Sequence, residues 1–201
     1  MLALTLFGVF FLIALAGVPL LFSILITTVG IIWAQDLGHP LETIFLSFIG
    51  GVEPFILLAV PLFIFAGELL AQGGVGKRIV EFARVLFGWL PGGLGVVTVM
   101  SCTMFGGVSG SAIADTAAIG SLVIPAMIAR GYSRGFAAAL LAVAGTIALL
   151  MPLSIPFLIY AFISGVSMRT LSMAGLLPAL ASAIALIVVC MWHGRKTGCD
   201  N

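Results

Sequence analysis

Long apolar segments make up most of the chain, and short polar or glycine-rich stretches separate them. The first apolar run extends from Leu2 to Ala34 and contains Gly17-Val18-Pro19 near its middle. As one helix it would be roughly 50 Å long, which is more than an ordinary membrane span requires. Two short spans joined by a tight turn are our preferred interpretation, and one long kinked helix is the alternative.

The next part of the chain alternates between polar stretches and apolar segments. After the polar stretch 34–43, residues 41–51 are predicted to form a short amphipathic or interfacial helix. Residues 54–70 form an apolar span in which Pro61 predicts a kink. Residues 71–93 place charged side chains at helical spacing, which is typical of a helix at the membrane surface, with a plain connecting loop as the alternative. These charged residues are Lys77, Arg78, Glu81 and Arg84.

The second half of the chain contains three further apolar segments. Residues 94–129 are apolar apart from one polar interruption, and residues 135–163 are apolar but contain two prolines. Arg169 marks a short loop before the last predicted span, residues 171–192.

Composition agrees with a membrane protein. Hydrophobic residues make up 62% of the 201 residues, charged residues only 7%, and the mean hydropathy is +1.33. A soluble domain needs a charged surface, so the pattern predicts an all-α polytopic membrane protein. The net charge of +1, without a basic stripe, excludes nucleic acid as a partner. The three cysteines and two histidines have no disulfide or metal-ligand spacing, so we expect no metal centre of that kind and no cofactor.

The distribution of charge predicts an orientation. Positive residues cluster at 77–84, 130–134 and 195–196, whereas the charged residues of 34–53 are all acidic. By the positive-inside rule, the three clusters are cytoplasmic and 34–53 is external. The N-terminus is then external and the C-terminus cytoplasmic, with Arg169 as an isolated external cation.

The polar interruption FGGVSGSAIADTAAIGS, residues 105–121, is the most unusual stretch. Residues 91–129 begin and end on the predicted cytoplasmic side, so they form either two full spans or a re-entrant hairpin with its tip at 106–111. Each arm has roughly 15 residues, fewer than an ordinary span needs. Non-helical backbone inside a membrane is tolerated only where it is buried in protein or lines a wet cavity. We therefore favour a re-entrant hairpin with a functional tip.

A second break is predicted in GTIALLMPLSIPF, residues 145–157. Pro152 and Pro156 each remove a backbone donor and free a carbonyl earlier in the chain. Secondary transporters build binding sites from discontinuous helices, whose N-terminal ends face anions and whose freed carbonyls bind Na⁺. The two breaks together favour a transporter.

These segments divide the chain into five predicted parts. They are N-terminal spans with an external interfacial segment (1–53), a span with a cytoplasmic surface helix (54–90), the re-entrant hairpin (91–130), the discontinuous helix (131–170), and a last span with the tail (171–201).

Two blocks resemble the large membrane (permease) subunit of TRAP (tripartite ATP-independent periplasmic) transporters. They are FGGVSGSAIADTAAIGSLVIPAMIARGYSRGFAAAL (105–140) and AGTIALLMPLSIPFLIY (144–160). The resemblance extends to about residue 190 through the weaker motifs GVPLLFSI (17–24), AVPLFIFAGELL (59–70), PGGLGVV (91–97) and AGLLP (174–178).

The resemblance implies one repeat of an inverted-repeat, elevator-type, Na⁺-coupled importer in the bacterial or archaeal cytoplasmic (inner) membrane. Such a subunit works with a small membrane subunit and a periplasmic substrate-binding protein. Typical substrates are C4-dicarboxylates, sialic acid and other organic acids. The implied ion and substrate site includes Gly106, Gly107, Ser109, Gly110, Ser111, Asp115, Thr146, Pro152 and Ser154. Sodium would be held through Ser109, Ser111, Gly110 and the 145–156 backbone.

The chain departs from the family in two ways. Members often have two adjacent prolines before Ser-Ile, and here Leu153 takes the second place. Members are also about twice as long and carry a second, inverted repeat, while HGRKTGCDN does not resemble family sequence. A fragment, a frameshifted gene and a truncated reading frame are all compatible with this.

Each candidate residue also has a structural interpretation. Gly106 and Gly110 have the small-xxx-small spacing that permits close helix packing. Asp115, an acid inside an apolar segment, either coordinates an ion or stabilises the N-terminal end of its helix. The hydroxyls of Thr146 and Ser154 either contact the ion or bond back to the helix.

The sequence suggests two alternatives to transport. A truncated chain that does not transport, or that only assists assembly, is the main alternative. Gly107-Val108-Ser109-Gly110 fits the GxSG pattern of rhomboid-type intramembrane proteases, but such an enzyme needs a buried histidine as base. The only downstream histidine is His193, at the predicted membrane edge, so we do not expect an enzyme.

Overall fold

The computed structural model describes residues 2–34, 41–52, 55–152 and 154–199. These residues form helices and turns without any β-strand. Contacts divide the chain into an N-terminal unit, Met1–Pro54, and a C-terminal unit, Phe55–Asn201.

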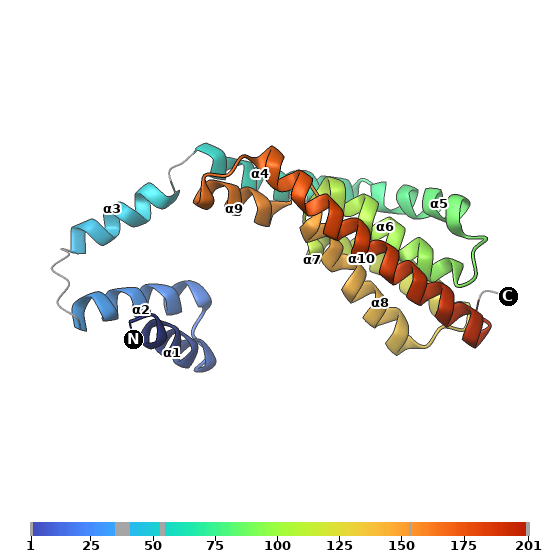
Figure 1. The fold of residues 1–201 in the computed structure, drawn as a ribbon, viewed down its shortest axis with the longest axis horizontal. Helices are drawn as coiled ribbons and strands as arrows, with labels where there is room; N and C mark the ends of the chain where they lie inside the picture. The colour runs from blue at the N-terminus through green and yellow to red at the C-terminus, as the bar shows by residue number, and fades with distance from the viewer. Residues whose placement is uncertain (1, 35–40, 53–54, 153, 200–201) are drawn as a thin grey trace. The chain divides into compact units, whose positions relative to one another are not determined.

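The N-terminal unit contains α1 (Leu2–Leu15), α2 (Leu20–Ala34) and α3 (Leu41–Val52). The first two helices lie side by side and are joined by a turn in which Gly17 has a φ of +87° (Figure 1). The apolar run 2–34 is therefore a helical hairpin, and the alternative of one long kinked helix is wrong. The interfacial segment predicted at 41–51 coincides with the helix α3.

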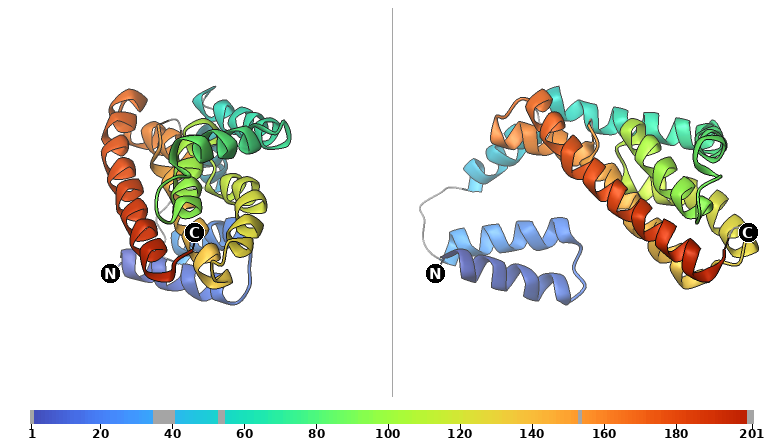
Figure 2. Two further views of the ribbon diagram at one scale, coloured as in Figure 1. Left: turned by 90° about the vertical axis from the view of Figure 1, so that its right-hand side faces the viewer. Right: turned by 45° about the vertical axis from the view of Figure 1, so that its right-hand side comes forward.

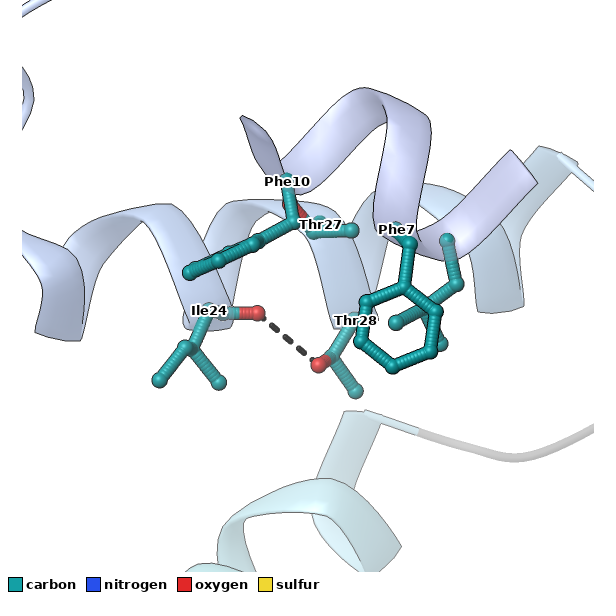
Figure 3. A pocket seen from close by; sticks show the side chains of 6 residues that line it. Phe7, Phe10, Ile24, Thr27 and Thr28 are labelled. Carbon is teal, nitrogen blue, oxygen red and sulfur yellow. Dashed lines mark hydrogen bonds between the residues drawn. The ribbon is translucent and has the colours of Figure 1, made fainter. Parts of the chain in front are cut away.

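Hydroxyl side chains line the inner face of α2. Ser23 and Thr27 are buried, and both satisfy their hydroxyls locally: Ser23 Oγ donates to the Val18 carbonyl at 3.1 Å and Thr27 Oγ1 to the Ser23 carbonyl at 2.6 Å. Figure 3 shows Phe10 of α1 lying over Thr27 beside a cavity of about 250 Å³. Small hydroxyl residues allow two apolar helices to approach closely without leaving a polar group unsatisfied.

The C-terminal unit begins with two helices that meet at an angle. The 3₁₀ turn Phe55–Leu58 leads into α4 (Ala59–Gln72), and α5 (Val75–Phe87) follows with a bend of 64°. Pro61 lies in the first turn of α4, where its missing N–H has no intrahelical partner to lose, so the kink predicted there is wrong. The segment 71–93 contains the helix α5, so its interpretation as a plain loop is wrong too.

The remaining helices pack around α6 (Gly93–Ser109), which lies between α5 and α10 (Figures 1 and 2). Nearly every α6 side chain from Leu94 to Phe105 is buried, as expected for a helix that is apolar all round. The helices that surround it in chain order are α7 (Ala112–Ala129), α8 (Arg134–Thr146), the 3₁₀ turn Ile147–Leu150, α9 (Ile155–Ser164) and α10 (Met168–Thr197).

The last helix is longer than predicted. It has 30 residues, includes Arg169 in its first turn, and continues through His193 to Thr197. Arg169 therefore does not mark the loop, which instead contains Gly165 with a φ of +68°. Pro178 lies inside this helix, which continues past it.

Among the described residues, three helical segments are long and apolar enough to cross a bilayer. They are Ala112–Ala129, Arg134–Ser164 and Met168–Thr197, and the bent pair α4–α5 would count as a fourth only if its two helices formed one span. With their many exposed apolar side chains, these segments define an all-helical, multi-pass membrane protein.

Candidate functional site: the hairpin tip and the broken helix

The polar stretch forms the tip of a helical hairpin. Helix α6 ends at Ser109, α7 begins at Ala112, and only Gly110 and Ser111 join them. Gly110 has a φ of +61°, a conformation that favours glycine, and its N–H closes α6 onto the Gly106 carbonyl at 3.0 Å. Ser111 is the N-cap of α7 and accepts a hydrogen bond from the Ala114 N–H at 3.4 Å. The arms have 17 and 18 residues, more than the 15 expected, and the second arm is long enough to cross a bilayer. The expectation of short arms is therefore wrong, and the re-entrant hairpin stays a prediction.

Asp115 lies behind this turn and is fully buried, with 0% of its surface exposed. Ser109 Oγ donates a hydrogen bond to Asp115 Oδ1 and accepts one from the Ser111 N–H at 3.2 Å. The other carboxylate oxygen, Asp115 Oδ2, has no hydrogen-bond partner among the described residues. Ser111 provides the side-chain cap of α7, and Asp115 lies in the first turn of that helix with one buried oxygen that accepts no hydrogen bond from the described residues.

The tip contacts the predicted break in the chain. A Cβ atom built on Gly106 would lie 2.6 Å from Ala148 Cβ, 2.7 Å from Ala148 Cα and 3.0 Å from Asp115 Oδ2. A Cβ on the neighbouring Gly107 would lie 3.4 Å from Met151 Cε. The absence of a side chain at Gly106 therefore allows α6 to pack directly on the 3₁₀ turn, beside the free oxygen of Asp115.

The helix is broken where the prolines predicted it. Helix α8 ends at Thr146, the 3₁₀ turn Ile147–Leu150 follows, and α9 begins at Ile155 with Pro156 in its first turn. Ser154 is fully buried, and its hydroxyl reaches back across the break to donate to the Leu149 carbonyl at 2.8 Å. Pro152 is half-buried in the break, and Leu153 lies outside the described residues.

Thr146 does not share this buried setting. Its side chain is exposed and donates to the Val143 carbonyl at 2.7 Å. It lines a shallow depression of about 420 Å³ between α7 and α8, together with Thr116. The structure thus brings Gly106, Ser109 and Asp115 together with the break, and it places Thr146 on another surface.

Sequence reasoning missed three contacts of the tip. A Cβ on Gly67 of α4 would lie 3.6 Å from the Ser109 carbonyl oxygen, so α4 passes directly beside the end of α6. Ala148 and Met151 are the residues of the break that face Gly106 and Gly107. A glycine in an apolar helix, such as Gly67, indicates that another helix can approach closely there. An alanine and a methionine in an apolar run give no such indication.

The arrangement offers oxygen ligands to a hard cation. It combines a buried carboxylate, small hydroxyls and backbone carbonyls at two interrupted helices, the ligand set that alkali ions prefer at membrane depth. The described residues contain no cluster of three or more histidine, cysteine, aspartate or glutamate side chains, which is what a transition metal would require.

A multi-pass helical protein in which a hairpin tip meets a broken helix belongs to the class of membrane transport proteins. The family described as "Tripartite ATP-independent periplasmic transporter, DctM component" matches residues 2–201. The match includes the tail, so the expectation that the resemblance ends near residue 190 is wrong. The chain therefore belongs to the DctM family, the large permease component of TRAP transporters.

Individual relatives agree. The isethionate TRAP transporter permease protein DctMQ of Oleidesulfovibrio alaskensis is 36% identical over 193 residues, which cover 96% of this chain and 30% of that protein. Two proteins of Vibrio cholerae, the C4-dicarboxylate large permease DctM and the sialic acid large permease SiaM, are 38% and 37% identical. These matches cover 87% and 92% of this chain, but only 38% and 41% of the relatives. The chain thus spans less than half the length of these relatives.

The family assignment also settles the question of an enzyme. These relatives are transporter permease subunits, so the protease interpretation of Ser109 falls. In the structure, Ser109 is hydrogen-bonded to Asp115, and His193 stacks on Phe136 with ring centroids 3.8 Å apart.

Proposed function

We propose that this chain provides one repeat of a Na⁺-coupled secondary transporter that imports organic acids. The observation that carries the proposal is the buried carboxylate of Asp115, whose Oδ2 has no partner among the described residues and lies where the hairpin tip meets the broken helix. Leaving a buried charged oxygen unsatisfied is costly, and a cation bound beside Asp115 would balance its charge.

Sodium would bind beside Asp115 Oδ2. Further ligands would come from the two breaks. They are the hydroxyls of Ser109 and Ser111, the Gly110 carbonyl and carbonyls of the 145–156 backbone. Ser109 and Ser154 each donate their hydroxyl proton to a neighbouring oxygen, which leaves only lone pairs on Oγ to face an ion. The substrate carboxylate would bind near the N-terminal end of α7, where the free backbone N–H groups and the helix dipole favour negative charge.

Substrate class and partners follow from the relatives. Relatives are named for C4-dicarboxylate, sialic acid and isethionate, all of which are acids. We infer an organic acid as substrate, delivered by a periplasmic binding protein and transported together with a small membrane subunit. The chain would reside in the inner membrane, with its three basic clusters in the cytoplasm, and would move substrate by an elevator motion.

Sodium binding to the purified chain tests the site. Titration with ²²Na⁺ should show saturable binding that Asp115→Asn lowers at least tenfold, because the amide keeps the size of the side chain but removes its charge. Thr146→Val is the matched control, because it removes an exposed hydroxyl outside the buried cluster. This variant should bind sodium as the unaltered chain does. Equal binding by the Asp115→Asn variant and the unaltered chain would sink the sodium site.

Uptake tests the whole function. Cells that express the chain with a candidate small membrane subunit and binding protein should accumulate a radiolabelled C4-dicarboxylate or sialic acid when sodium is present. Membrane insertion without uptake by this set would instead favour a remnant that does not transport or that only assists assembly.

A further inference from the structure

Helix α5, Val75–Phe87, presents three different faces along its length. Its inner stripe, at intervals of four and three residues, packs on the core of the C-terminal unit and consists of Gly76, Val80, Ala83 and Phe87. A Cβ on Gly76 would lie 3.6 Å from Ile119 Cδ1, so α5 is in close contact with α7 on this side. The inner stripe fixes which side chains of α5 point away from the protein.

A second stripe is exposed and mainly apolar. Phe82 and Val85 follow Arg78 at helical spacing, and Trp89 lies in the turn directly after the helix. These three residues are 53%, 80% and 78% exposed. The indole N–H of Trp89 donates to the Leu86 carbonyl at 2.8 Å. Because the one polar atom of this ring is already satisfied, the ring can enter an apolar phase at little cost.

The third stripe is exposed and charged, with Lys77, Glu81 and Arg84 one helical turn apart. Among the described residues, none of the cations Lys77, Arg78 and Arg84 has a hydrogen-bond or ion-pair partner. With Glu81 included, the outer surface of α5 carries an excess of two positive charges beside an apolar stripe.

The bend of the chain is consistent with this division of faces. Helix α4 exposes Leu62, Phe65 and Leu69, as a helix in contact with acyl chains does, and α5 departs from its direction by 64°. A helix that turns out of the direction of an apolar neighbour, with one apolar and one basic outer stripe, matches the pattern of helices at the headgroup boundary.

We propose that α5 is a binding surface for anionic phospholipid. The stripe Phe82–Val85–Trp89 enters the acyl region, while Lys77, Arg78 and Arg84 bind the phosphates of anionic headgroups. Anionic headgroups complement the charge of this surface, whereas zwitterionic headgroups have no net charge to balance three unpaired cations.

Trp89 provides a direct test of this surface. The variant with Trp33→Phe and Trp192→Phe keeps Trp89 as its only tryptophan. In lipid nanodiscs, the quenching of Trp89 fluorescence by brominated phosphatidylglycerol is compared with its quenching by brominated phosphatidylcholine. Because one basic side chain near a membrane surface strengthens binding of anionic lipid about fivefold, Trp89 should favour phosphatidylglycerol by at least that factor. The triple variant K77Q/R78Q/R84Q should quench equally with both lipids.

Two controls separate this from a general property of the protein. Glu81→Gln removes the single acid of the stripe and should raise the preference for phosphatidylglycerol. A chain that keeps only Trp33, which is exposed at the end of α2 in the N-terminal unit, should show no preference. Equal quenching of Trp89 by the two lipids, or a preference that survives K77Q/R78Q/R84Q, overturns the proposal and would leave this face to a protein partner.

Discussion

A single methyl group at Gly106 tests how closely the hairpin tip must approach the broken helix. The Cβ of Gly106→Ala would lie 2.6 Å from Ala148 Cβ and 2.7 Å from Ala148 Cα. Carbon atoms in contact are normally 3.5–4.0 Å apart, so α6 and the 3₁₀ turn must separate by about 1 Å. The nearest atoms belong to backbone and to a short side chain, and no rotamer change relieves the contact.

The neighbouring glycine is the control for this change. The Cβ of Gly107→Ala would meet only the end of a flexible side chain, Met151 Cε at 3.4 Å. Both substitutions gain about 0.8–1 kcal/mol of helix propensity, so that gain cancels in the comparison. The overpacking at Gly106 costs about 1–3 kcal/mol, and this cost is the expected difference between the two variants.

The measurement is thermal unfolding of the two purified variants in the same detergent, together with ²²Na⁺ binding. A difference of about 1–3 kcal/mol corresponds to a midpoint about 2–12 °C lower for Gly106→Ala in a chain of this size. Sodium affinity should fall in the same variant, because Asp115 Oδ2 lies 3.0 Å from the added methyl group. Equal midpoints and equal sodium affinities for the two variants would refute the close contact and its place in the site.

Two further predictions use matched pairs. Gly145→Ala places a Cβ 2.1 Å from Thr116 Oγ1, and should cost about 1–3 kcal/mol; adding Thr116→Ala should recover most of it in a double-mutant cycle of unfolding free energies. Full additivity of the two changes would contradict the contact. Gly92→Ala should be more destabilising than Gly131→Ala in the same unfolding assay. Both glycines have positive φ, but only at Gly92 would the Cβ approach another chain segment, 2.3 Å from the Cys190 carbonyl oxygen. We expect a difference in unfolding free energy of about 1 kcal/mol or more. Equal midpoints would remove that close approach.

The two breaks were predictable because their causes are local. Gly110 takes a positive φ that ends α6, Pro152 lies in the second break, and Pro156 fits only the first turn of the helix that follows it. The kink at Pro61 was predicted wrongly. A proline is tolerated in the first turn of a helix and disruptive in its interior, and hydropathy does not mark where α4 begins.

The contacts between the breaks were not predictable from the residues alone. That Ala148 faces Gly106, or that Gly67 lies beside the Ser109 carbonyl, depends on which helices pack together, and a uniformly apolar chain gives many equivalent choices. The start of α10 was missed for a related reason. Arg169 suggested a loop, yet a long charged side chain is tolerated in the first turn of a helix that ends at the membrane edge.

The continuous helix α10 connects two distant parts of the C-terminal unit. Near one end, Gly175 lies against the Leu150 carbonyl and Phe157, and near the other, Gly194 lies against Gly92 at the base of the hairpin. Nineteen residues of helix separate these two attachment points by about 28 Å. Helix α10 lacks one backbone hydrogen bond at Pro178, because proline has no N–H to donate to the Ala174 carbonyl. We therefore expect a displacement of the broken helix relative to the hairpin base to bend α10 close to Pro178.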